Sequence, residues 1–339
     1  MRPISPTARK RFCEGQATLM FYSIRHITRF RYSQPVHESV TELRMQPRSE
    51  GPQSLRNFQI VTNPRAQLYA YTDYLGNAVY HFNVLRAHEM LRIDVQAVVE
   101  IAARPAPPAA ADPLEWQRYN RYNLTDEHFD LIEPSKFAKP SRALQEFAAA
   151  HDLVAPQGDP LTALRRLNKT IYDGFDYEVG VTQVHSPIET ALAAKRGVCQ
   201  DFAHVMIAVA RSWGIPTRYV SGYLHHRRKG QYRSGEDATH AWVEAYLPSL
   251  GWLGFDPTND IEAGERHIRV AVGRDYADVP PTRGTYKGEA ESELAISVTV
   301  EPTQAPVRHE EFLRVARPLK QTPQSAAEKL YHQQQQQQQ

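Results

Sequence analysis

The sequence predicts an α+β protein, with a β-rich N-terminal region followed by helices and a second group of strands. Apolar residues alternate with polar ones over residues 22–32 and, more cleanly, over residues 91–101, as in half-buried strands. The run ARPAPPAAADP at residues 103–113 ends this pattern, because proline lacks the donor that a strand needs. Helical spacing follows, and strand patterns return from Thr217.

The region before this run is predicted to be an antiparallel β module. A further alternation at residues 80–84 lies between its first and last strands, and the turn residues Asn63-Pro64 and Gly76-Asn77 bound the segments. The proline-rich run itself makes a stiff connector. We therefore place a β-rich N-terminal domain at residues 20–102 and a Pro/Ala linker at residues 103–113.

Helix and strand signals both occur after the linker, and they predict a second domain at residues 114–301. Ser141 and Asp159 are suited to cap two helices. Ser186-Pro187-Ile188-Glu189 has the composition of a capping box, and we expect its helix to stop at Gly197. Strands of this domain are predicted at residues 217–224, 240–247 and 251–255, with one more at the late alternation of residues 294–300.

Both ends of the chain lack such patterns. We expect a disordered leader at residues 1–19, which has no apolar core of signal-peptide length. We also expect a disordered tail at residues 302–339, which is rich in Pro and Gln and ends in seven glutamines. No run of about 18 to 20 apolar residues predicts a membrane span. With no secretion signal and only two cysteines, the expected location is the cytoplasm.

The composition argues against several classes of partner. The 40 basic and 38 acidic residues leave a formal net charge of +2, without the clustered positive field that nucleic-acid binding needs. Zinc-site spacings, HExxH, GxxxxGK[ST] and the EF-hand loop are absent from the sequence. We therefore expect no nucleic acid, no membrane, no cofactor and no metal.

The two cysteines, Cys13 and Cys199, are too few for a disulfide framework, so each is judged by its surroundings. Cys13 lies in the unpatterned leader. Cys199 lies at the start of a predicted helix, where free N–H groups and the helix dipole favour a thiolate and an oxyanion. A small buried cysteine is the alternative interpretation.

A base and an orienting acid, which a nucleophilic cysteine needs, follow Cys199 in the chain. His240 begins one predicted strand and Asp256 ends the next. A hairpin that turns at residues 248–250 brings the two side by side, provided that the register puts both on one face. Less direct candidates are Asp260 as a rival acid, and Tyr177 and Gln183 as a second oxyanion donor.

Three blocks carry a resemblance to a known family: RGVCQDFAHVMIAVARSWGIPTRYVSGYL at residues 196–224, THAWVEAYLP at residues 239–248 and GWLGFDPTND at residues 251–260. They resemble the transglutaminase-like superfamily of cysteine enzymes. The resemblance implies a papain-like catalytic core with a triad of Cys199, His240 and Asp256. Residues 20–102 are similar to the β-rich N-terminal domain of the bacterial branch, which makes residues 114–301 the catalytic domain.

The resemblance implies acyl transfer from an amide or peptide bond through a thioester. Cys199 would attack the carbonyl, His240 would accept and return the proton, and Asp256 would orient the imidazole. The implied partners are a peptide or amide substrate and an acyl acceptor. Water as acceptor gives a peptidase or amidase, which we favour slightly, and an amine gives a transglutaminase. The alternative function is a catalytically inactive transglutaminase-like scaffold that binds a partner peptide, and the oligomeric state stays open.

Overall fold

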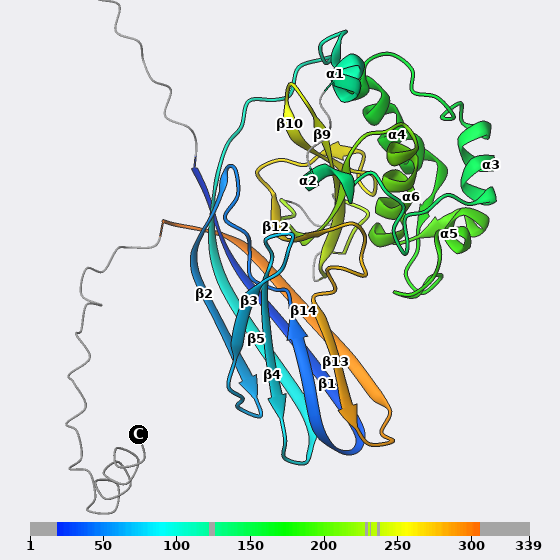
Figure 1. The fold of residues 1–339 in the computed structure, drawn as a ribbon. Coiled ribbons are helices and arrows are strands. Elements are labelled where there is room, and N and C mark those ends of the chain that lie inside the picture. Colours follow the sequence, from blue (N-terminus) through cyan, green and yellow to red (C-terminus); the bar gives the residue numbers. More distant parts are fainter. Residues whose placement is uncertain (1–18, 122–125, 228–229, 231, 236–237, 306–339) are drawn as a thin grey trace, which may run out of the picture. The chain divides into compact units, whose positions relative to one another are not determined.

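The structure is a computed structural model that describes residues 19–121, 126–227, 230, 232–235 and 238–305 (Figure 1). The expected disordered leader and tail therefore lie outside the described residues, apart from residue 19 and residues 302–305. Within the described part of the chain, no helix is long and apolar enough to cross a membrane.

Seven antiparallel strands form the first sheet, in the order β2-β5-β1-β4-β3, with β13 and β14 also paired to β1 (Figure 1). The long β1 is the central strand: its first half lies between β5 and β14, and its second half lies between β4 and β13. The alternation at residues 91–101 is confirmed, because every second residue from Leu91 to Ile101 is buried. The strands are β1 (Leu19–Leu43), β2 (Gln53–Asn63), β3 (Tyr69–Thr72), β4 (Ala78–Val84), β5 (His88–Ala102), β13 (Thr282–Lys287) and β14 (Ser292–Thr303).

The last two strands differ from the sequence-based domain assignment, which placed residues up to 301 in the second domain. β14 pairs with β1 from Phe21 opposite Thr303 to Tyr32 opposite Ser292, so the end of the described chain completes the N-terminal sheet. The strand predicted from the alternation at residues 294–300 is confirmed. The strand with which it pairs could not be predicted from the sequence, because local periodicity does not encode which remote strand it joins.

Within the described residues, six helices follow the linker: α1 (Glu115–Arg121), α2 (Asp126–Phe129), α3 (Arg142–Ala150), α4 (Pro160–Gly174), α5 (Ile188–Ala194) and α6 (Cys199–Ser212), with the short parallel strands β6 (Asp176–Tyr177) and β7 (Arg196–Gly197) beside them. Ser141 and Asp159 cap α3 and α4 through their side-chain oxygens, as predicted.

The predicted capping box before α5 is wrong. Pro187 is the N-cap residue and has no side-chain oxygen with which to cap the helix, while the Ser186 hydroxyl accepts a hydrogen bond from the Gln183 N–H at 2.9 Å. The helix ends at Ala194, where Lys195 takes the left-handed conformation with φ 51°, rather than at Gly197.

The second sheet has five antiparallel strands in the order β11-β10-β9-β8-β12. Residues 241, 243, 245 and 247 of β9 pack with Phe202 and Met206 of α6 in the largest apolar core. Even-numbered residues of β9 therefore face the opposite side of the sheet. The strands are β8 (Thr217–Leu224), β9 (His240–Leu247), β10 (Gly251–Asp256), β11 (Ile261–Glu262) and β12 (His267–Gly273).

Side-chain amides from the first sheet region cover the outer edge of β12. Gln53 Oε1 accepts from the Arg269 N–H at 2.9 Å, and its amide group donates to Arg269 O at 2.8 Å. Asn77 repeats this arrangement on the N–H and C=O of Val272, at 2.8 Å for both bonds. An edge strand that would otherwise present free backbone groups is thus satisfied by the N-terminal region.

Candidate active site

Cys199 is the first residue of α6 and is partly exposed. Val198 before it is extended, and its N–H donates to the carboxylate of Asp201 at 2.9 Å. The N–H groups of Asp201 and Phe202 bond to Val198 O. The N–H groups of Cys199 and Gln200 belong to the first turn of α6, where the helix itself offers them no acceptor, so they are available to a negative oxygen near the sulfur.

The glycine two residues before Cys199 is required by close packing. A Cβ atom at Gly197 would lie 2.6 Å from Asp201 Oδ2. That carboxylate also accepts a hydrogen bond from the Thr182 hydroxyl at 2.6 Å. Asp201 therefore fixes the chain where it enters α6, and a larger residue at position 197 would displace it.

The β9–β10 hairpin brings His240 and Asp256 together. Leu247 lies opposite Gly251 and Val243 lies opposite Phe255, so residues 240 and 256 share one face of the sheet. His240 Nε2 lies 2.7 Å from Asp256 Oδ2, and both side chains are buried. The hairpin geometry expected from the sequence is confirmed.

Four donors converge on the carboxylate of Asp256. Oδ2 accepts from His240 Nε2 at 2.7 Å, from the Asn259 amide at 2.8 Å and from His267 Nε2 at 3.2 Å, while Oδ1 accepts from the Thr258 N–H at 3.0 Å. Burial by itself would raise the pKa of Asp256, but His240 and His267 hold it far below its usual range. The group is therefore a buried carboxylate anion at neutral pH.

The carboxylate also fixes the tautomer of His240. Asp256 is ionised and can only accept hydrogen bonds, so Nε2 of His240 carries a proton. Nδ1 is then the nitrogen of the ring that can exchange a proton with a neighbouring group. Nδ1 is buried and has no hydrogen-bond partner among the described residues. Burial by itself would lower the pKa of His240, but Asp256 and the neighbouring Cys199 raise it to about 10. The imidazole of His240 can therefore hold a second proton, on Nδ1, when the neighbouring Cys199 is a thiolate.

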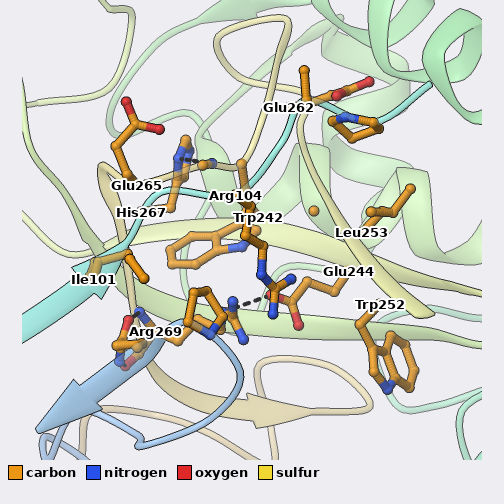
Figure 2. Close-up of a pocket in the computed structure, with 18 of the residues that line it drawn as sticks. Ile101, Arg104, Trp242, Glu244, Trp252, Leu253, Glu262, Glu265, His267 and Arg269 are labelled. Atoms are coloured by element: carbon orange, nitrogen blue, oxygen red, sulfur yellow. Dashed lines mark hydrogen bonds and ion pairs between the residues drawn. The ribbon is translucent and has the colours of Figure 1, made fainter. Parts of the chain in front are cut away.

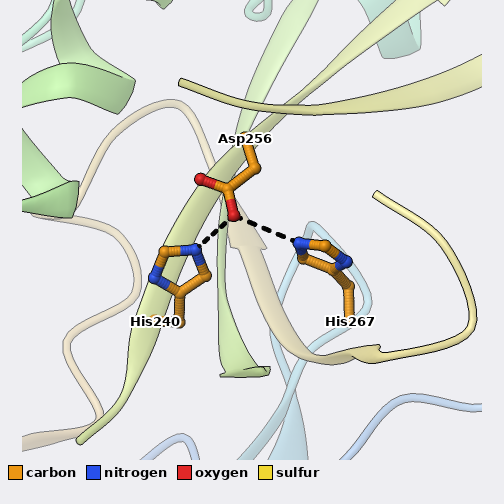
Figure 3. A group of neighbouring side chains, drawn as sticks. All are labelled: His240, Asp256 and His267. Carbon is orange, nitrogen blue, oxygen red and sulfur yellow. Dashed lines mark hydrogen bonds and ion pairs between the residues drawn. The ribbon is translucent and has the colours of Figure 1, made fainter. Parts of the chain in front are cut away.

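His267, the first residue of β12, is a buried third member of this group that the sequence reasoning missed (Figure 3). The Gly264 N–H donates to its Nδ1 at 3.2 Å, so the neutral ring carries its proton on Nε2 and donates it to Asp256. Burial lowers the pKa of His267, which keeps the ring neutral. The alternation in residues 267–273 marks a strand, but no local signal places its first residue beside Asp256.

Two family models match the chain, one for the transglutaminase-like superfamily at residues 148–257 and one for the bacterial transglutaminase-like N-terminal region at residues 22–100. An uncharacterized protein of Mycobacterium leprae, ML0607, is 34% identical over 276 residues, which cover 81% of this chain and 96% of that protein. The chain belongs to the transglutaminase-like superfamily. Members of this superfamily generally carry out cysteine-based acyl transfer.

Two further similarities bear on the fold and the chemistry of this transglutaminase-like chain. The protein-glutamine gamma-glutamyltransferase of Pseudomonas aeruginosa is 31% identical over 159 residues, which cover 44% of this chain and 23% of that enzyme. A crystal structure from Cytophaga hutchinsonii, described as a proposed cysteine protease, aligns with a TM-score of 0.67 over 86% of this chain and 93% of that one. At 18% identity this structure establishes the fold alone, which is the α+β, papain-like class that the sequence predicted.

The geometry of the transglutaminase-like site does not fit a metal ion. One nitrogen from each of His240 and His267 and a carboxylate oxygen of Asp256 lie within 4.8 Å of one another, close enough for three ligands. A histidine that binds a metal normally donates its other N–H to an acceptor. Nδ1 of His267 instead receives the N–H of Gly264, so a metal on Nε2 would require a deprotonated ring. The hydrogen bonds account for the cluster.

The other residues predicted from the sequence as candidates for the site lie in different environments. Asp260 accepts from the Asn168 amide at 3.1 Å and does not contact His240, so Asp256 is the acid beside the imidazole. Burial and the neighbouring Cys199 raise the pKa of Tyr177, which keeps its phenol protonated near the sulfur. Gln183 bonds through its backbone, whose N–H donates to the Ser186 hydroxyl and whose C=O accepts from the Ser186 N–H, each at 2.9 Å. Cys13 lies outside the described residues.

Proposed function

We propose that this chain is a cysteine acyl-transfer enzyme that acts on amide or peptide bonds through a thioester, with water favoured over an amine as acceptor. Cys199 is the nucleophile, His240 the general base and acid, and Asp256 the orienting group. The observation that carries the proposal is the contact of His240 with Asp256: the carboxylate lies 2.7 Å from Nε2, and the buried Nδ1 has no hydrogen-bond partner among the described residues, which leaves it able to take the proton of the neighbouring Cys199.

Each half of the reaction moves one proton through Nδ1 of His240. His240 Nδ1 accepts the proton of the Cys199 thiol, and the thiolate attacks the amide carbonyl carbon. The protonated imidazole then gives this proton to the leaving amine, and the carbon–nitrogen bond breaks to leave a thioester on Cys199. In the second half, His240 removes a proton from water, which attacks the thioester, and returns it to the sulfur.

The start of α6 is the proposed place for the negative oxygen of the tetrahedral intermediate. The N–H groups of Cys199 and Gln200 supply donors there, and the helix N-terminus adds its positive end. Tyr177 is the proposed second donor, since its raised pKa keeps the phenol able to donate at neutral pH. An inactive scaffold that binds a peptide would have no need of a buried His–Asp pair, which costs desolvation energy.

A mass-spectrometric screen of peptides and simple amides, run with and without added lysine or polyamine, tests the proposal. We expect hydrolysis by the parent chain, none by Cys199→Ala, and at most a minor amine adduct. Predominant amine adducts would reverse the choice of acceptor. If no substrate turns over, iodoacetamide at pH 6 separates the alternatives: faster labelling of Cys199 in Cys13→Ala than of Cys13 in Cys199→Ala supports an activated thiol, and equal slow labelling supports the scaffold.

A further inference from the structure

A cavity of about 280 Å³ lies on the face of the second sheet opposite α6, between that sheet and the linker. The linker contributes Arg104 and the residues that follow it, while β9, β10 and β12 contribute the floor (Figure 2). An adjoining cavity of about 560 Å³ shares Arg104, Trp252 and Arg269 with the first. Cys199, His240 and Asp256 line neither cavity, whereas His267, which contacts Asp256, lines the first, so this space adjoins the proposed site of acyl transfer without including the three proposed catalytic residues.

A chain of alternating charges runs along the wall of these cavities. Glu50 accepts from Arg48 at 2.8 Å and from Arg218 at 3.0 Å. Glu244 accepts from Arg218 at 2.6 Å and from Arg269 at 3.0 Å. Each carboxylate thus lies between two guanidinium groups, and the side chains of Arg218 and Glu244 are nearly buried at 8% and 5% exposure.

Arg104 departs from this alternation, because its neighbour along the cavity wall is Arg269 and not a glutamate. A Cβ atom added to Gly51 would lie 2.3 Å from Arg104 Nη2 and 4.0 Å from Arg269 Nη1, so the two guanidinium nitrogens are within about 6.3 Å of each other. The side chain of Arg104 makes no hydrogen bond or ion pair with any described residue. Figure 2 shows Arg104, Arg269 and Glu244 directed to the same part of the cavity.

The charges of this cluster are not balanced. Of the arginines that line the two cavities, Arg104, Arg218 and Arg269 face Glu50 and Glu244, which leaves an excess of one positive charge. The two other carboxylates that line the cavity have arginine partners elsewhere: Glu262 pairs with Arg165 at 2.6 Å, and Glu265 lies 3.8 Å from Arg227. Burial and Arg269 lower the pKa of Arg104, and Glu244 and Glu50 raise it by less, so the net shift is downward.

We propose that this cavity binds an organic carboxylate between Arg104 and Arg269. The carboxylate takes the place of the missing third acid in the alternating chain, and two guanidinium forks suit its planar pair of oxygens. The apolar part of the ligand lies against Trp252 and the linker residues Pro105 and Pro107, which line the same space. A monoanion is favoured over a phosphate dianion, because three glutamates also line the cavity and would repel a second negative charge.

Calorimetric titration of the full chain carrying Cys199→Ala with phenylacetate tests this proposal, with 2-phenylethanol as the neutral ligand of similar shape. We expect phenylacetate to bind and 2-phenylethanol to bind at least about tenfold more weakly. Arg104→Gln should weaken phenylacetate binding at least about tenfold and leave the alcohol unaffected. Arg142→Gln, which removes a 91% exposed arginine on α3, is the matched control and should change neither.

Several results would overturn the proposal. These are no phenylacetate binding up to about 10 mM, equal binding by the parent and Arg104→Gln, and tighter Arg104-dependent binding of inorganic phosphate than of phenylacetate. Circular dichroism checks that Arg104→Gln is folded. If it is not, Arg104→Lys keeps the charge but loses the fork, and an affinity equal to that of the parent would then count against recognition by the guanidinium pair.

Discussion

Replacing His267 by leucine tests whether the hydrogen bonds around Asp256 position the proposed base. The change removes one of four donors to that carboxylate, the one at 3.2 Å, and fills the space with an apolar side chain. A hydrogen bond to a charged group contributes about 1.5–3 kcal/mol, and we take the low end, about 1.5 kcal/mol, for the longest of the four bonds. This is roughly one tenfold step in a rate or an equilibrium.

We therefore expect kcat of His267→Leu to fall about tenfold with little change in KM, because the loss affects the base rather than substrate contacts. His267→Gln keeps an N–H donor and should recover most of the loss. The assay is hydrolysis of whichever amide the substrate screen identifies, measured over a full range of substrate concentration at pH 7.

The stability of the same variant has a predictable pH dependence. Asp256 and His267 both have pKa values lowered by folding, so each contributes stability that is present above its unfolded pKa and lost as pH falls. The destabilisation of His267→Leu relative to the parent should then shrink from pH 8 toward pH 5, as the unfolded histidine protonates near pH 6.5. Urea unfolding at these pH values measures it.

His204→Leu is the matched control for both measurements. His204 is also buried with a lowered pKa, and its Nε2 also accepts one backbone N–H, from Tyr276 at 3.2 Å, but it makes no bond to Asp256. It should reproduce the stability trend and leave kcat nearly unchanged. An equal loss of kcat in the two variants, or full kcat in His267→Leu, would refute the positioning role.

Three further predictions concern the triad and the edge of β12. Cys199→Ala should abolish turnover and leave the thermal unfolding transition largely unchanged; residual turnover would exclude Cys199 as the nucleophile. Asp256→Asn should lower kcat/KM by about 10³–10⁴-fold, because His240 loses both its charge partner and its fixed tautomer while its burial remains; a pH–rate profile like that of the parent would contradict this. Asn77→Ala should lower the free energy of unfolding, measured by urea titration, by about 2–5 kcal/mol, because the N–H and C=O of Val272 lose their hydrogen-bond partners. Asn83 is exposed, and Asn83→Ala should lower the free energy of unfolding by less than about 0.5 kcal/mol.

The sequence predicted those parts of the site that depend on local geometry. A tight hairpin has few registers, so the neighbourhood of His240 and Asp256 followed from the lengths of two strands and one turn. His267 could not be found this way, because β12 pairs with β8 on the other side of β9, and the approach of its first residue to Asp256 is a tertiary contact. The pairing of β14 with β1 could not be predicted for the same reason, since 276 positions separate partners such as Ile24 and Val300.

The edge of β12 links the N-terminal region to the chemistry proposed for the second sheet. Gln53 and Asn77 bond to the backbone of β12 at Arg269 and Val272, and His267 is the first residue of that strand. Because the strand is held along its outer edge, the position of His267 beside Asp256 depends on residues that lie some 200 positions earlier in the chain. The β-rich region therefore supports the proposed triad through β12, which gives it a structural reason to accompany the second sheet that does not require it to bind a partner peptide.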